Sequence, residues 1–404
     1  MQRSPLANVA RISAGGWFEA YDLFMTSYIA LGLYRDRLFS PTGQGTAAFA
    51  TFVGSGFAGM FAGTLFFGWV SDRFGRRATF AWSLVFYSVM TLGMALAQSA
   101  LAIDVWRFFA GIGIGVQIIT IDAYLTEIAP ADQRGKYIAL SQALTFTAVP
   151  VVALLAAWFV PRDIGGFSGW RIVAAIGAAG AVAAWALQRG LPESARWLAV
   201  KDTGGWTDLG GPTYRARTLM LVAFNVLQTF GYYGFSSWVT TLLFQEHVDF
   251  VRSLQYTAVI AFANPFGPLV AMYFADRVER KSQLAVLAVA IAGALVAFAA
   301  ARSPAAILTW GIALALALNW FSSAFHAYQA ELYPTRVRAR AVGFAYSWSR
   351  FSSIFVGFAV AAVLQRFGPS AVFLMIAGAM IAVAAIVALF GPRTNRMNLE
   401  SIAP

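Results

Sequence analysis

The sequence predicts an all-α membrane protein in which twelve transmembrane helices form two six-helix bundles related by pseudo-two-fold symmetry. Three observations predict this fold. The chain of 404 residues is 59% hydrophobic and only 12% charged, and its apolar runs are too long and too numerous for a soluble core. Two different charged motifs recur 204 positions apart, close to half the chain length. A polar stretch rich in glycine and proline separates the two halves.

Each half contains six apolar runs of roughly 20 to 28 residues, which is long enough to cross a bilayer. The polar stretch 191–215 predicts a cytoplasmic linker that lets the halves rock, between an N-terminal bundle at 1–190 and a C-terminal bundle at 216–404. The predicted spans are 14–34, 46–69, 78–98, 102–126, 137–161, 169–189, 216–245, 253–275, 282–301, 304–329, 341–365 and 369–391.

Basic residues predict the orientation. An even number of spans puts both termini on one face, and most Lys and Arg lie in the loops of that face. Since cytoplasmic loops retain Lys and Arg during insertion, both termini are predicted to be cytoplasmic. The net charge of +11 is then explained by topology and anionic lipid, not by nucleic-acid binding. The arginine and alanine bias is typical of GC-rich bacteria, so we expect a bacterial cytoplasmic (inner) membrane.

The first repeated motif lies between spans two and three. Asp-Arg-Phe-Gly-Arg-Arg at 72–77 returns as Asp-Arg-Val-Glu-Arg-Lys at 276–281. An aspartate can cap a helix N-terminus, and arginines can tie a loop to carboxylates and lipid phosphates. With Gly68, the first copy resembles the signature loop of the major facilitator superfamily. The second copy departs from it, because Met272 and Glu279 replace the two glycines.

The second repeated motif lies at the ends of spans four and ten. Glu-Ile-Ala-Pro at 127–130 with Arg134 returns as Glu-Leu-Tyr-Pro at 331–334 with Arg338. The resemblance implies that both motifs form cytoplasmic gates that lock the halves together in the outward-open state. The alternative is ordinary rim ion pairs worth about 0 to 1 kcal/mol each. The expected gating residues are Asp72, Arg73, Arg76, Glu127, Arg134, Asp276, Arg277, Glu331 and Arg338.

Two further segments are similar to the sugar porters and their organic-ion relatives. Arg107 is followed by glycines at 111, 113 and 115, and Pro-Glu-Ser-Ala-Arg follows span six at 192–196. The resemblance covers nearly the whole chain and implies a secondary active transporter with a central cavity. The sequence contains no phosphate loop, paired metal ligands or nucleophile–base motif, and no cysteine. We therefore expect no enzymatic activity, cofactor or metal, and a monomer.

The acid of span one is the candidate for proton coupling. Asp22 matches the first-helix aspartate of proton-coupled sugar and organic-acid porters, where it faces the fourth-helix arginine, here Arg107. Desolvation disfavours a charged carboxylate and a nearby guanidinium favours it. A rocking motion that makes and breaks the pair would therefore change its proton affinity. The alternative is a static buried salt bridge that fixes helix packing.

Arg350 in span eleven is the candidate for substrate binding. A guanidinium offers two parallel hydrogen bonds to a carboxylate. An arginine here is unusual among neutral-sugar porters and familiar from aromatic-acid, nicotinate and synaptic-vesicle-protein-like relatives. The alternative is pairing with Asp122 or Glu19. Asp122 could also be a second proton site or the anchor for a cationic group, and the sequence does not separate these roles.

Spans five, seven and ten supply the other candidates. The glutamines typical of sugar porters are absent from spans five and seven, where only Gln142 and Gln228 remain, and span seven adds a Tyr-Tyr-Gly run. His326 is predicted to be a core histidine in preference to a ligand or proton relay. The candidate substrate-binding residues are Arg350, Asp122, Glu19, Tyr21, Gln142, Asn225, Gln228, Tyr232, Tyr233, Trp238, Trp320 and His326.

These residues favour proton-coupled uptake of a small organic anion, namely an aromatic or heteroaromatic monocarboxylate such as nicotinate or benzoate. Tyr21, Tyr232, Trp238 and Trp320 would stack on its ring. The alternatives are a sugar or polyol symporter, drug or metabolite efflux, and a non-transporting receptor of the same fold. The 204-residue repeat separates the gate from the substrate site. The gate motifs occur in both halves, whereas the position in the first half that corresponds to Arg350 is Phe146.

Overall fold

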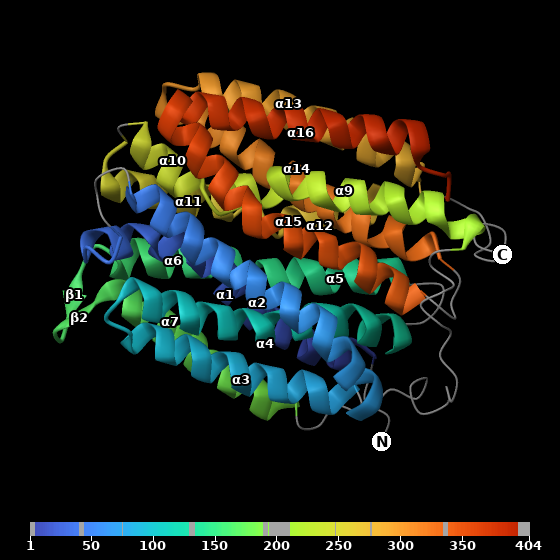
Figure 1. Cartoon of the computed structure of the whole chain (residues 1–404), viewed down its shortest axis with the longest axis horizontal. Helices are drawn as coiled ribbons and strands as arrows, with labels where there is room; N and C mark the ends of the chain where they lie inside the picture. The colour runs from blue at the N-terminus through green and yellow to red at the C-terminus, as the bar shows by residue number, and fades with distance from the viewer. Residues whose placement is uncertain are drawn as a thin grey trace.

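The computed structural model is built almost entirely of helices and describes residues 5–39, 44–74, 76–128, 134–188, 193, 211–246, 248–274, 277–333 and 338–394. The helices form two groups that lie side by side along their length (Figure 1). The first half of the chain forms one group, and the second half forms the other. The predicted pair of bundles is therefore confirmed.

The N-terminal bundle contains six spans, and the fifth is divided at Thr147. A short hairpin of β1 and β2 joins the fifth and sixth spans, with Asp163 paired to Ser168. The elements are α1 (Pro5–Arg35), α2 (Gln44–Phe74), α3 (Arg76–Leu96), α4 (Ala100–Ile128), α5 (Arg134–Phe146), α6 (Ala148–Phe159), β1 (Asp163–Ile164), β2 (Phe167–Ser168) and α7 (Gly169–Gln188).

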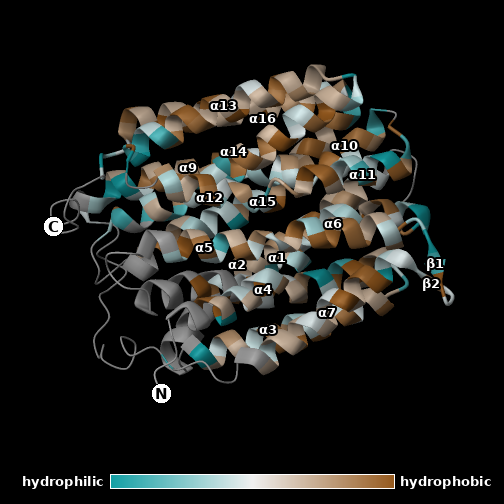
Figure 2. Ribbon diagram, turned by 180° about the vertical axis from the view of Figure 1, so that it is seen from behind, coloured by the Kyte–Doolittle hydropathy of each residue, from teal (hydrophilic) through white to brown (hydrophobic). Residues whose placement is uncertain are grey.

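The C-terminal bundle also contains six spans, and its first two are each divided into two helices. The elements are α9 (Pro212–Ser236), α10 (Val239–Gln245), α11 (Phe250–Ala261), α12 (Phe266–Phe274), α13 (Arg280–Ala300), α14 (Pro304–Glu331), α15 (Arg338–Phe367) and α16 (Pro369–Phe390). Within the described residues, nine spans satisfy length and hydropathy criteria for crossing a membrane. Apolar residues dominate the middle of the helices (Figure 2).

The three breaks have local causes. Pro150 lacks the N–H that would continue the helix across Thr147, and Pro265 precedes the first residue of α12. At the end of α9, the Ser236 hydroxyl donates to the Tyr232 carbonyl at 2.6 Å, a bond that competes with the helix ladder. The continuous spans predicted for segments five, seven and eight are therefore interrupted helices.

The two bundles meet along three pairs of spans. α2 packs on α15, α5 and α6 pack on α12 and α11, and α1 packs on α10. Gln365 donates to Thr46 at 2.6 Å, and the Phe49 and Trp238 rings lie 4.8 Å apart, so these contacts join the bundles toward the hairpin end. In Figure 1 that end is opposite the end where α1 begins and α16 ends.

Glycine allows α2 and α4 to pack backbone against backbone. A Cβ atom at Gly111 would overlap the Gly56 carbonyl, and one at Gly115 would overlap the Met60 carbonyl. From the other side, a Cβ at Gly59 would overlap the Phe108 carbonyl. Small residues at such spacing let membrane helices approach closely. The glycine run after Arg107 thus has a packing function.

We predict that Gly111→Ala destabilises the protein by about 1–3 kcal/mol, the typical cost of overpacking. The added methyl can avoid the Gly56 carbonyl only by separating α2 from α4. Gly293→Ala is the matched control, because no atom lies within 4 Å of a Cβ placed there. Thermal unfolding of the purified variants measures the effect. Equal melting temperatures would show that the helices separate without cost.

Candidate functional site

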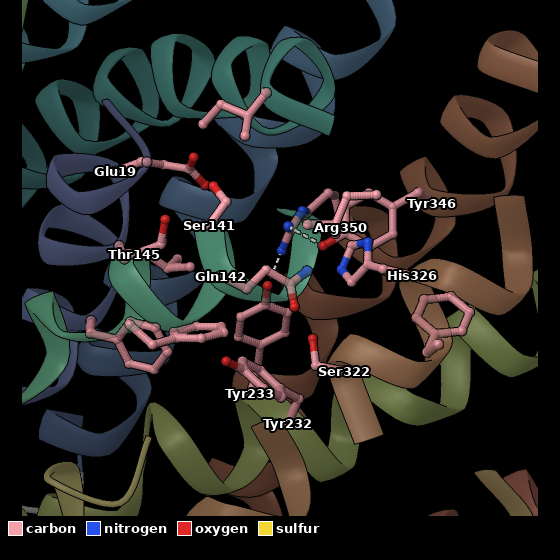
Figure 3. Close-up of a pocket in the computed structure, with 18 of the residues that line it drawn as sticks. Glu19, Ser141, Gln142, Thr145, Tyr232, Tyr233, Ser322, His326, Tyr346 and Arg350 are labelled. Atoms are coloured by element: carbon pink, nitrogen blue, oxygen red, sulfur yellow. Dashed lines mark hydrogen bonds between the residues drawn. The ribbon is translucent and has the colours of Figure 1, made fainter. Parts of the chain in front are cut away.

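A cavity of about 120 Å³ lies between the two bundles, and α1, α4, α5, α9, α14 and α15 form its walls. Its apolar lining combines the aromatic rings of Phe24, Phe146 and Phe325 with aliphatic side chains of α1, α4 and α5. Figure 3 shows its labelled polar side chains arranged around this space. The polar lining residues are Glu19, Ser141, Gln142, Thr145, Gln228, Tyr232, Tyr233, Ser322, His326, Tyr346 and Arg350.

Arg350 projects from α15 into the cavity wall, with a relative exposure of 2%. One terminal nitrogen donates to the Tyr233 hydroxyl, and the other donates to the Tyr346 hydroxyl at 2.7 Å. Its guanidinium carbon lies 4.7 Å from the centre of the Tyr346 ring. Its Nε has no hydrogen-bond partner among the described residues. Among the described residues, the hydroxyls of two tyrosines thus accept the hydrogen bonds of this buried cation.

Glu19, one suggested partner of Arg350, lies near enough to interact with it electrostatically. Both residues line the cavity, but the hydrogen bonds of Arg350 go to Tyr233 and Tyr346. The side chain of Asp122, the other suggested partner, lies outside the described residues.

The other predicted lining residues are held by hydrogen bonds and ring contacts. Gln228 donates to Ser349 at 3.3 Å, and Tyr232 donates to Asn319 at 3.1 Å. The His326 ring lies 5.2 Å from the Tyr346 ring in an edge-to-face arrangement. His326 therefore belongs to the cavity wall, among the candidate substrate-binding residues that the sequence suggests.

Gln142 connects the two bundles at the cavity. Its side-chain oxygen accepts a hydrogen bond from the Ser323 hydroxyl of α14 at 2.6 Å. Gln142 is the glutamine that remains near the stretch of span five where sugar porters place a binding glutamine, and it lines the cavity.

Two predicted site residues lie inside their own bundles. Tyr21 is 1% exposed and donates to the Val173 carbonyl at 2.8 Å, so it packs between α1 and α7. Asn225 is buried and donates to the Leu221 carbonyl at 2.9 Å within α9. Neither lines the cavity, because each lies on the face of its helix that contacts its own bundle.

Two predicted tryptophans also lie away from the cavity. Trp238 is fully buried against Phe49 between the bundles, where it helps to close the hairpin end. Trp320 stacks on Phe274, with ring centres 5.0 Å apart. Neither indole lines the cavity, so the geometry gives no support to their predicted stacking on a substrate ring.

Asp22 and Arg107 form a buried ion pair inside the N-terminal bundle, and each is 2% exposed. Thr91 donates to the other carboxylate oxygen of Asp22 at 2.5 Å, and Arg107 also donates to Thr26 at 2.6 Å. The predicted contact between spans one and four is confirmed. Arg107 Nε has no hydrogen-bond partner among the described atoms.

Two of the predicted gating residues, Glu331 and Arg277, have contacts that the structure describes. Glu331 lies 3.0 Å from Arg280 in an ion pair, and the guanidinium of Arg277 lies 3.8 Å from the centre of the Tyr273 ring. Glu331 was expected to act with Arg338. The side chains of Asp72, Arg73, Arg76, Glu127, Arg134 and Arg338, and the whole of Asp276, lie outside the described residues.

The sequence analysis missed four polar residues of the cavity, namely Ser141, Thr145, Ser322 and Tyr346. Tyr346 could have been found, because it lies four residues before Arg350 and therefore on the same helix face. Ser141 and Thr145 have the same spacing in α5. A spacing of one helical turn from another cavity residue was therefore the sequence feature that could have identified these side chains.

Comparison with known proteins supports the same family. The model of the Major Facilitator Superfamily matches residues 12–318 and 257–403. The niacin transporter NiaP of Acinetobacter baylyi is 28% identical, and the match covers 96% of this chain and 94% of NiaP. The cis,cis-muconate transport protein of the same species is 27% identical over 73% of each chain.

A solved structure supports the fold. The partially occluded inward-open form of the xylose transporter XylE from Escherichia coli superimposes with a TM-score of 0.83. The match covers 98% of this chain and 99% of XylE at 18% sequence identity, so it concerns the fold alone. The chain therefore belongs to the Major Facilitator Superfamily, as a multi-pass membrane protein that transports a small molecule and is not an enzyme.

Proposed function

We propose that this protein takes up a small aromatic or heteroaromatic monocarboxylate, such as nicotinate or a benzoate, together with protons. The observation that supports this most is the burial of Arg350 in the cavity wall with only phenols as hydrogen-bond acceptors. A buried cation is costly without a compensating charge. A substrate carboxylate would supply that charge and accept charge-assisted hydrogen bonds.

The apolar part of the cavity fits an aromatic ring. Phe24 lies edge-to-face with both Phe146 and Tyr232, with ring centres 6.3 Å apart in each pair. Aromatic rings favour such edge-to-face and offset neighbours, each worth about 0.5–1.5 kcal/mol beyond simple burial. Tyr232 is the predicted stacking residue that lines the cavity. Phe24, Phe146 and Phe325 would take the place of Tyr21, Trp238 and Trp320.

The named relatives favour an acid over a sugar. NiaP is named for niacin, and the muconate protein is named for a dicarboxylic acid. The xylose transporter shares the fold at low identity, and a neutral sugar would leave Arg350 without a countercharge. Efflux of drugs or metabolites has no specific support in the described residues.

Proton coupling is proposed for Asp22, with Arg107 as its regulator. In the present arrangement the Asp22 carboxylate pairs with Arg107 and accepts a hydrogen bond from Thr91. If α4 moves relative to α1 during transport, the pair separates and the carboxylate loses its countercharge. The Asp22–Arg107 pair is buried in one bundle, whereas the proposed site for the substrate carboxylate at Arg350 lies between the bundles. The proton and the substrate therefore do not compete for the same side chain.

Alternating access is proposed to involve the doubled motifs at the ends of the spans. The Glu331–Arg280 pair belongs to this set and ties α14 to α13. We also propose that these motifs and both termini face the cytoplasm, in a bacterial inner membrane. The distribution of Lys and Arg supports that orientation.

Replacing Arg350 by Lys should weaken benzoate or nicotinate binding at least about tenfold, because a lysine cannot reproduce the planar, two-pronged donor. Equilibrium binding to the purified protein measures this effect. Arg302→Lys is the control, since Arg302 is an exposed loop residue 3.9 Å from Glu246. Unchanged affinity in Arg350→Lys would rule out the carboxylate role.

Asp22→Asn should abolish accumulation driven by a pH gradient and preserve substrate counterflow, because the amide cannot bind and release the proton. Asp163→Asn is the control, as Asp163 is an exposed acid that pairs with Arg35 at 2.5 Å. Proteoliposome uptake measures both activities. The double variant Asp22→Asn/Arg107→Gln avoids an uncompensated buried charge. Normal pH-driven accumulation by either variant would leave Asp22 as a structural ion pair.

A further inference from the structure

We infer that the cavity accepts one carboxylate only, at Arg350, and that Glu19 on the facing wall accepts a hydrogen bond from a donor at the far end of the substrate. The substrate class is then a ring monocarboxylate with a hydroxyl, an amino group or a protonated ring nitrogen away from the carboxylate. This inference rests on the proposed function and narrows it.

The ionisable side chains of the cavity are divided between its two walls. Glu19 enters from α1 of the N-terminal bundle, whereas Arg350 and His326 enter from α15 and α14 of the C-terminal bundle. Figure 3 shows Glu19 and Arg350 on opposite sides of the space, with Ser141 beside Glu19. A ligand between them meets an anionic wall at one end and a cationic wall at the other.

The hydroxyls near Glu19 keep that wall polar. Ser141 shares a hydrogen bond with Ser13 at 2.8 Å and is 1% exposed, so its position is fixed by the bundle. Thr145 follows one helical turn later and also lines the cavity. The N-terminal wall therefore offers oxygen acceptors to a ligand donor, in addition to the Glu19 carboxylate.

Glu19 and Asp22 have separate positions although they lie three residues apart. Asp22 is enclosed by Arg107 and Thr91 inside the bundle. Glu19 is partly exposed and faces the cavity. The carboxylate that meets the substrate is therefore different from the one proposed for proton coupling.

This arrangement discriminates among acids. A dicarboxylate bound at Arg350 would bring its second carboxylate toward Glu19, and like charges repel strongly where water is scarce. Of the two relatives' acids, niacin has a single carboxylate, whereas cis,cis-muconate has two. The inferred site would accept niacin, whose ring nitrogen becomes a donor when protonated, and would reject muconate.

The test compares ring acids that differ at one position. Benzoate, 3- and 4-hydroxybenzoate, and the dicarboxylates isophthalate and terephthalate are titrated against the purified full-length protein. A hydroxyl at the 3-position, at the 4-position or at both should increase the affinity about tenfold relative to benzoate, as expected for a hydrogen bond to a charged acceptor. The dicarboxylate with its second group at the same position should bind more weakly than benzoate.

Glu19→Gln should remove the hydroxyl advantage and should raise dicarboxylate affinity at least about tenfold, because the repelling charge is gone. A gain of binding is not expected from simple damage to the fold. Glu246→Gln is the matched control, since Glu246 lies outside the cavity near Arg302. It should leave all five affinities unchanged.

Similar affinities of the wild-type protein for all five acids would overturn the inference, and this comparison does not depend on the folding of any variant. An equal loss of affinity for every acid in the Glu19→Gln variant would also overturn the inference. In both cases binding of benzoate that requires Arg350 would leave the proposed function intact. Failure of all five acids to bind would overturn both.

Discussion

The cost of holding a charge at bilayer depth is the constraint on which this structure depends. An ionised side chain there costs about 2.5–3.5 kcal/mol even on insertion scales, so each such group needs a compensating partner. The N-terminal bundle meets this need internally, because Arg107 pairs with Asp22. The C-terminal bundle gives Arg350 only the hydroxyls of Tyr233 and Tyr346. In the function proposed above, a bound substrate anion supplies the carboxylate acceptor for Arg350.

Part of this arrangement could be predicted from the sequence. The repeated charged motifs and the glycine-rich linker predicted two six-span bundles, and the match to first- and fourth-helix motifs predicted the Asp22–Arg107 contact. Intramembrane charge predicted Arg350 and Glu19 at the cavity, because a bilayer tolerates few charges without function. The helix breaks at Thr147 and before α12 could also have been predicted, since Pro150 and Pro265 lie close to them in the sequence.

The positions of the aromatic candidates relative to the cavity could not be predicted from the sequence. Tyr21, Trp238 and Trp320 have the right chemistry to stack on a ring, but side-chain type does not reveal which face of a buried helix points to the cavity. Apolar residues occur on all faces of these spans, so hydrophobic periodicity carries little information about their rotation. Tyr346 shows the converse, because its spacing from Arg350 located it better than its residue type did.

The close packing of α2 on α4 has a mechanical consequence. Without side chains between Gly56 and Gly111, a displacement of α4 cannot be absorbed by rotamer changes and must move α2 with it. α4 bears Arg107, and α2 lies against α15, where Phe61 meets Phe351 with ring centres 5.4 Å apart. The glycine contact between α2 and α4 thus couples a movement of the buried ion pair to a movement of α15, the helix that presents Arg350.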